Sequence, residues 1–94
     1  MSLRYLTAAK CVAELRSVTR AGEQLNRSQT AISKAIIELE SQLNVPLFDR
    51  TTSGVSTTVY GEALSHRVTM AMAEFESASN IYDQFKKSRR DFHN

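Results

Sequence analysis

The sequence predicts a mainly α-helical fold in which a short β-hairpin separates three helices from one long final helix. The 94 residues include one proline, Pro46, and three glycines, and so few helix-breaking residues favour helices. Apolar residues recur every three or four positions on both sides of a central segment, which is the spacing of helices that bury one face. In that segment, residues 47 to 57, the spacing gives way to two short β-forming runs.

The first part of the chain is expected to form two helices. One face of residues 3 to 15 is apolar and consists of Leu3, Leu6, Ala9, Val12 and Ala13. A second, shorter helix follows, because Ser17 or Thr19 can cap its first turn by accepting a backbone hydrogen bond. We expect this helix to end near Asn26, since asparagine tolerates the left-handed backbone of a sharp turn.

A third helix and the hairpin follow. Ser28 is the expected cap of this helix, and Pro46 stops it. Its apolar face is formed by Ile32, Ile36, Leu39 and Leu43. Residues 47–50 and 55–57 are the expected strands, and Gly54 supplies the permissive backbone of the tight turn between them.

The final helix carries the most regular apolar pattern in the chain. Thr58 can cap it, and Glu62 in its first turn favours the helix dipole. Its apolar residues follow a heptad spacing and are Gly61, Leu64, Val68, Ala71, Phe75, Ala78, Tyr82 and Phe85. A helix of about 25 residues is roughly 40 Å long, which exceeds the small domain on which it could pack.

This apolar seam has two interpretations. Either the distal half of the helix pairs with a second copy of the chain, or the whole seam packs on its own domain. The length of the helix favours pairing. The residues expected at the dimer interface are Leu64, Val68, Ala71, Phe75, Ala78, Tyr82 and Phe85.

Net charge alone does not predict a nucleic-acid partner, because it is only +2. The distribution of charge is more informative. Between residues 16 and 34 a single acid is accompanied by four cations, Arg16, Arg20, Arg27 and Lys34. Clustered cations attract phosphate, although a local excess of this size is more often a solvated surface.

Three helices followed by a hairpin form the plan of a winged helix-turn-helix domain, with the helix-turn-helix at about residues 18–37. Gly22 is expected where the second helix closely approaches the third. The polar face of the third helix suits base edges in a major groove, and its first turn suits a phosphate. Arg50 and the tip of the hairpin, or wing, suit the DNA backbone or minor groove. The residues expected to contact DNA are Arg20, Arg27, Ser28, Gln29, Thr30, Ser33, Lys34, Arg50, Thr51, Thr52 and Ser53.

The residues themselves resemble those of the LysR-type transcriptional regulators. The likeness is carried by Ser17-Val18-Thr19-Arg20-Ala21, by Ser28-Gln29-Thr30-Ala31-Ile32-Ser33-Lys34 with Leu39-Glu40, and by Leu43-Asn44-Val45-Pro46-Leu47-Phe48-Asp49-Arg50. It covers residue 1 to about residue 62 without a gap. The Ser-Gln-x-Ala-x-Ser run followed by Leu-Glu is highly specific.

This resemblance implies a cytoplasmic bacterial regulator that binds promoter DNA as a homodimer, at an interrupted and partly palindromic operator. Residues 1–58 would form the DNA-binding domain, 59–88 the linker helix that pairs with its counterpart, and 89–94 a tail. The family's effector-binding domain is absent from these residues, so we expect no small-molecule effector to bind within this chain.

The chain departs from the usual pattern of the family around the third helix. Thr30 stands where the family commonly has proline, and Ala35 and Ile37 stand where polar groups are frequent. At the last two positions the polar groove contacts are expected either to be absent or to be replaced by contact with a thymine methyl group. Arg27 replaces a turn residue that is frequently apolar, and we expect it to contact a phosphate.

Other classes of function have less support. Glu62 and His66 share a helical face but lack further metal ligands nearby, and Cys11 has no evident partner residue, so neither an enzyme nor a metal or cofactor site is expected. No apolar run reaches the roughly 18 residues of a membrane span. The remaining alternative is a helical dimerisation module that does not bind DNA, which the seam and the weak net charge would support.

Overall fold

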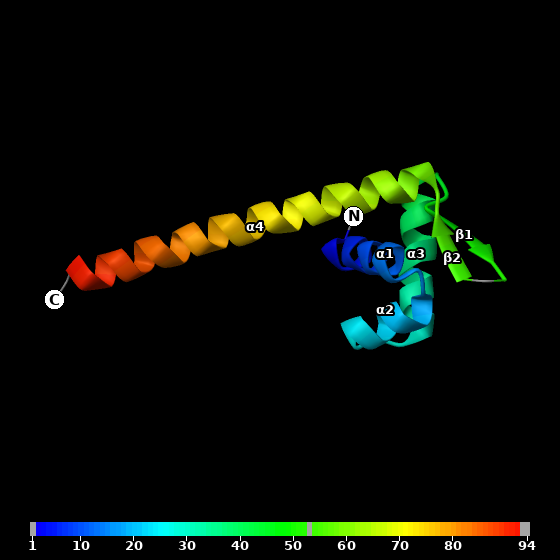
Figure 1. Cartoon of the computed structure of the whole chain (residues 1–94), viewed down its shortest axis with the longest axis horizontal. Coiled ribbons are helices and arrows are strands. Elements are labelled where there is room, and N and C mark those ends of the chain that lie inside the picture. The colour runs from blue at the N-terminus through cyan, green and yellow to red at the C-terminus, as the bar shows by residue number, and fades with distance from the viewer. Residues whose placement is uncertain (1, 53, 93–94) are drawn as a thin grey trace.

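The computed structural model describes residues 2–52 and 54–92 and contains the helices and strands in the predicted order (Figure 1). These elements are α1 (Leu3–Leu15), α2 (Val18–Leu25), α3 (Gln29–Leu43), β1 (Phe48–Thr51), β2 (Gly54–Thr57) and α4 (Val59–Phe92). The predicted winged helix-turn-helix with a long final helix is therefore confirmed. The three short helices and the sheet gather at one end of α4, which projects from them along a molecule 62 Å long (Figure 1).

Serine hydroxyls cap the first turns of α2 and α3. Ser17 Oγ accepts a hydrogen bond from the Arg20 N–H (3.1 Å), which identifies Ser17 rather than Thr19 as the cap of α2. Ser28 Oγ accepts in the same way from the Ala31 N–H (3.0 Å). Both helices therefore begin where their local sequence predicts.

All three short helices end on a residue with positive φ. Asn26 has a φ of 56° and Asn44 a φ of 57°, which is a conformation that asparagine tolerates. The end of α1 is less expected, because Arg16 adopts a φ of 54° there. Its N–H donates to the Val12 carbonyl oxygen (2.7 Å), so a backbone hydrogen bond closes the helix.

The core lies where α1, α2 and α3 meet. Its largest fully buried side chains are Val12, Ile32, Leu39 and Leu47. The buried face of α1 is rotated from the predicted one, since its buried residues are Ala8, Ala9, Cys11 and Val12. The prediction that Leu3 belongs to this face is wrong: its side chain is 70% exposed, because nine residues of helix place it half a turn away from the buried Val12.

The wing is a two-stranded antiparallel hairpin, as predicted. Phe48 lies opposite Thr57, and Thr51 lies opposite Gly54. Gly54 has a φ of 134°, which a residue with a side chain rarely adopts, so this position requires glycine. Phe48 and Val55 pack against the core, one from each strand, and hold the wing beside the helices.

The long helix α4 extends to Phe92, beyond the predicted boundary at residue 88. Residues 89–92, which were predicted to form a tail, therefore continue the helix. The physical reason is that cations such as Lys86 and Arg89 form helices readily and interact favourably with the negative end of the helix dipole.

The beginning of the α4 seam packs within the protomer. Gly61 and Val68 are buried, and Leu64 is half-buried against the core. From Ala71 onwards the seam is exposed, and Phe75 has 75% of its surface accessible. The place of Leu64 and Val68 in a dimer interface stays a prediction, whereas their packing on the protein's own domain is part of the fold.

Candidate nucleic-acid interface

The outward face of α3 carries the polar residues that the sequence singles out. Four buried aliphatic residues on the opposite face fix the rotation of the helix. The predicted contact residues on this helix are all exposed or half-exposed: Gln29, Thr30, Ser33 and Lys34. At the N-terminal end, backbone N–H groups and the positive end of the helix dipole add to the Ser28 hydroxyl, so this end favours a bound anion.

The turn between α2 and α3 depends on Gly22. A Cβ atom at this position would lie 2.7 Å from the Arg27 carbonyl oxygen, and the Arg27 N–H donates to the Gly22 carbonyl oxygen (2.8 Å). The expected close approach is thus present, and it is made by the turn itself. The Arg27 guanidinium donates from Nη1 to the Arg4 carbonyl oxygen (3.4 Å), which ties the turn to α1. Its contact with a phosphate stays a prediction.

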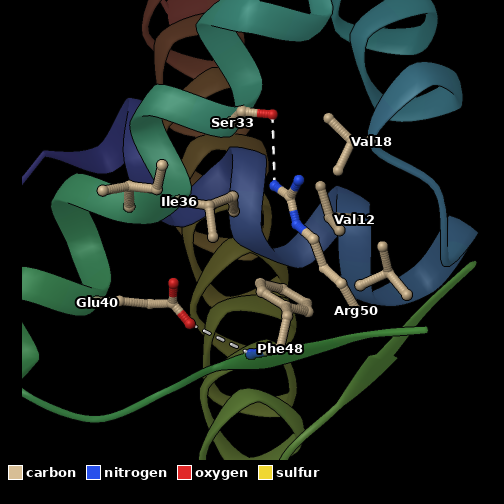
Figure 2. Close-up of a pocket in the computed structure, with 9 residues that line it drawn as sticks. Val12, Val18, Ser33, Ile36, Glu40, Phe48 and Arg50 are labelled. Atoms are coloured by element: carbon tan, nitrogen blue, oxygen red, sulfur yellow. Dashed lines mark hydrogen bonds between the residues drawn. The ribbon is translucent and has the colours of Figure 1, made fainter.

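The wing places Arg50 against α3. Its Nη2 donates a long hydrogen bond to Ser33 Oγ (3.5 Å), so two residues predicted from separate segments lie side by side (Figure 2). At the tip, Thr51 Oγ1 donates to a backbone carbonyl across the turn (3.1 Å), and Thr52 is exposed. Ser53, also a predicted contact, lies outside the described residues.

Among the described residues, no acidic side chain forms an ion pair with the cations of this surface. Arg20, Lys34 and Arg50 are all exposed. In the part of the chain that the structure describes, the ion pair found joins Lys10 and Glu14 (2.8 Å), within α1. The three surface cations are therefore available to an anionic partner such as a phosphate backbone.

The structure corrects one expectation about α3. Ala35 is buried and belongs to the core, so it does not face a groove; of the two alternatives for this position, contact with a thymine methyl group is wrong and absence of the groove contact agrees with the structure. The reason is helical geometry, because Ala35 follows the buried Ile32 by three residues and so lies on the same face. Ile37 is 62% exposed on the outward side, and for this residue the contact stays a prediction.

Glu40 belongs to the family signature, but its structural role was not predicted from the sequence. Its Oε2 accepts hydrogen bonds from the Leu47 N–H (2.6 Å) and the Phe48 N–H (3.4 Å), at the start of the wing. A signal was present, because Glu40 follows Ile36 by four residues and therefore lies beside the apolar face of α3. A half-buried acid in that position needs hydrogen-bond donors, and the segment after the helix supplies them.

The described residues do not form a metal-binding cluster or a membrane-spanning helix. Among them, no three His, Cys, Asp or Glu side chains gather where they could hold a metal ion. No described helix has a stretch long and apolar enough to cross a lipid bilayer. Cys11 is packed in the core, and its burial raises the pKa of the thiol, an effect that the charge of Glu14 increases.

The residues that build this surface match a known family. Residues 3–62, from α1 through the wing to the first turn of α4, match the sequence model described as bacterial regulatory helix-turn-helix protein, lysR family. The chain belongs to this family. Membership indicates DNA binding and regulation of transcription as the general function.

Individual relatives are regulators of the same family. The chain is 44% identical over 70 residues to the HTH-type transcriptional regulator GalR of Pseudomonas putida, a match that covers 74% of this chain and 18% of GalR. It is 46% identical over 63 residues to the HTH-type transcriptional regulator BudR of Klebsiella aerogenes, covering 67% of this chain and 44% of BudR. The chain therefore spans less than half the length of either relative.

Solved structures share the whole architecture. The fold matches the BenM DNA-binding domain in complex with catB site 1 DNA with a TM-score of 0.84 and 26% identity, covering 89% of this chain and 93% of that one. It matches the CbnR DNA-binding domain in its DNA complex with a TM-score of 0.76 and 27% identity, covering 89% and 95%. These matches extend beyond residue 62, so they include part of the long helix.

Proposed function

We propose that this chain reads double-stranded DNA in a sequence-specific way, with α3 in the major groove and the wing beside it. The observation that carries the proposal is the contact between Arg50 and Ser33, which joins the wing and the polar face of α3 into one cationic surface. A helix with this outward face suits hydrogen bonds to base edges. The wing then reaches the DNA backbone or the minor groove. The BenM and CbnR domains, which share this fold, were solved with DNA.

We infer that the chain acts as a homodimer through the distal part of α4. The part of the seam that the protomer leaves exposed consists of Ala71, Phe75, Ala78, Tyr82 and Phe85. Its three aromatic side chains are between 65% and 75% exposed, and a continuous apolar stripe of this kind is unfavourable in water. Pairing places two DNA-binding domains about a two-fold axis, and this geometry matches an interrupted palindromic operator at a promoter.

Selection from a pool of random duplex DNA tests both parts of this function. We expect recovery of two inverted half-sites at a fixed spacing, because a two-fold dimer presents the same reading surface twice. Recovery of a single half-site without a spaced repeat would contradict the dimeric arrangement. Failure to enrich any sequence would contradict direct reading and would leave the helical dimerisation module as the function.

Mutation of two cations tests which surface makes the contact. Lys34→Ala combined with Arg50→Ala is expected to lower affinity for the selected DNA about 100-fold at low salt, because two charge-assisted phosphate or base contacts are lost. The matched control is Lys86→Ala combined with Lys87→Ala, which removes the same charge at the far end of α4 and should change affinity less than about threefold. Equal losses in both double variants would show that only net charge matters.

A further inference from the structure

The carboxylate of Glu40 connects α3 to the first residues of the wing. It accepts the N–H groups of Leu47 (2.6 Å) and Phe48 (3.4 Å) on the same oxygen (Figure 2 shows the contact with Phe48). Glu40 is half-buried, and hydrogen bonds to an ionised acceptor are stronger in such a site than in water. The carboxylate therefore fixes where β1 begins relative to α3.

The start of α4 holds the same segment from its other side. The Thr58 N–H donates to the Leu47 carbonyl oxygen (3.0 Å), and Thr58 Oγ1 donates to the Pro46 carbonyl oxygen (2.6 Å). Gly61 lies so close that a Cβ atom there would overlap the Leu47 carbonyl oxygen. The segment before β1 is thus bound to α4 by its carbonyl groups and to α3 by the N–H groups that Glu40 accepts.

Between Glu40 and Arg50, side chains of the wing and of α3 line a common cavity. A cavity of about 240 Å³ lies there, with an apolar lining that includes Val12, Val18, Ile36, Phe48 and Val55 (Figure 2). The cavity is partly open to solvent and lies between side chains of α3 and β1, so polar contacts at its two ends add to the packing of Phe48 and Val55 on the core. Polar contacts set the distance between β1 and α3 at two points, Glu40 with Phe48 at one end and Ser33 with Arg50 at the other.

We propose that Glu40 is a positioning residue for the DNA-binding surface, because it holds β1 at the distance from α3 at which Arg50 lies beside Ser33. Arg50 follows Phe48 by two residues, so both side chains lie on the same face of the strand. A shift at the start of β1 therefore moves the guanidinium of Arg50. The role of this position in affinity rests on the proposed DNA-binding function.

A double-mutant cycle tests whether Glu40 acts through Arg50. Arg50→Ala should lower affinity for the selected DNA about tenfold in the wild-type background. After Glu40→Ala it should lower affinity less than about twofold, because the guanidinium is already displaced. In the Glu40→Gln background, Arg50→Ala should have an intermediate effect on affinity, since the amide oxygen of glutamine still accepts a hydrogen bond. The same tenfold loss in both backgrounds would overturn the proposal, because Glu40 would then affect stability alone.

Glu38→Ala is the matched control, since Glu38 is an exposed acid on the same helix. In this background the full effect of Arg50→Ala should persist, and a reduced effect would overturn the proposal. If Glu40→Ala does not fold by circular dichroism, Glu40→Leu takes its place in the cycle, because it also removes the hydrogen-bond acceptor, and there an undiminished loss of affinity on Arg50→Ala would overturn the proposal.

Amide hydrogen exchange without DNA separates this proposal from the proposed function. Glu40→Ala, or Glu40→Leu in its place, should speed amide exchange at Leu47 and Phe48 at least about tenfold, while amides of α2 keep their rates. Unchanged exchange at Leu47 and Phe48 would overturn the positioning role. Faster exchange in a protein whose wild type binds no DNA would support the positioning of the wing and contradict the proposed function alone.

Discussion

Cys11 is the residue at which burial most clearly changes chemistry. Its side chain lies in the core beside α2 and α3, and burial raises the pKa of the thiol above its ordinary value of 9.0. The negative charge of Glu14, one turn further along α1, raises this pKa as well, and Lys10 opposes it. The folded protein therefore favours the neutral thiol, which packs as a small apolar group.

This shift predicts a loss of stability at alkaline pH. In the unfolded chain the thiol loses its proton near pH 9.0, whereas the folded protein holds the proton to higher pH. The contribution of the neutral Cys11 thiol to the free energy of unfolding is therefore complete below pH 9.0, and it is lost as the pH rises through the pKa of the folded protein. Urea unfolding at about pH 8 and about pH 10 should show a steeper fall for the wild type than for Cys11→Ala. Equal slopes in the two proteins would contradict the raised pKa.

Single residues were predictable from the sequence where their role depends on the adjacent backbone. Ser28 caps α3 and Asn26 ends α2, because both act on groups within a few residues. Ala35 was misjudged, since its face depends on how α3 packs as a whole. The role of Glu40 was missed because its partners lie seven and eight residues away, across a turn whose path is set by tertiary contacts.

Among the elements, α3 is the one whose first turn has two roles, a structural one in capping the helix and a proposed one in binding DNA. Ser28 must satisfy a backbone N–H as the cap, and we propose that the same end of the helix faces a DNA phosphate. Serine suits both roles because its hydroxyl is neutral. An acidic cap would suit the first role and oppose the second, so the two roles can be separated by substitution.

We predict that Ser28→Asp folds with nearly wild-type stability but binds DNA at least about tenfold more weakly. Aspartate is as good a cap as serine, whereas its charge repels a phosphate. Ser28→Ala should instead lower the free energy of unfolding by about 1 kcal/mol. Urea unfolding and mobility-shift titration measure the two effects. Ser2→Asp, the same change at the cap of α1, is the control, and an equal loss of affinity there would contradict a specific role for Ser28.

The order of the elements was predictable because each has local signals, namely caps, turn residues and apolar spacing. The end of α4 was not, because no glycine or proline follows residue 85 to stop the helix. The sequence also could not show that Arg50 and Ser33 are in contact. The sequence assigns both residues to a DNA-binding surface, and the packing of the wing on the core brings them together.

At the scale of the whole molecule, the apolar seam of α4 lies in two environments, buried within the protomer at its start and exposed to solvent further along. Leu64 and Val68 pack within the protomer, while Phe75 and the seam residues after it are exposed. Spacing of three and four residues reports that a helix has an apolar face, and it says nothing about what covers that face. The sequence therefore could not divide the seam, and the structure places the division between Val68 and Ala71.

This division makes the distal seam the place to test assembly without disturbing the DNA-binding domain. We predict that Phe75→Asp raises the dimer dissociation constant at least about 100-fold, because an unpaired carboxylate in an apolar interface is strongly unfavourable. Sedimentation equilibrium should then show a monomer. Circular dichroism should remain that of the wild type, since Phe75 is 75% exposed in the protomer.

Ala73→Asp is the matched control, because it introduces the same charge on an exposed face of α4 opposite Phe75. It should remain dimeric. If the two-fold arrangement is right, Phe75→Asp should also lose its preference for paired half-sites over a single half-site, whereas Ala73→Asp should keep it. A dimer of unchanged mass in Phe75→Asp would refute pairing through the distal seam, and a monomer in both variants would show that charge anywhere on this helix prevents assembly.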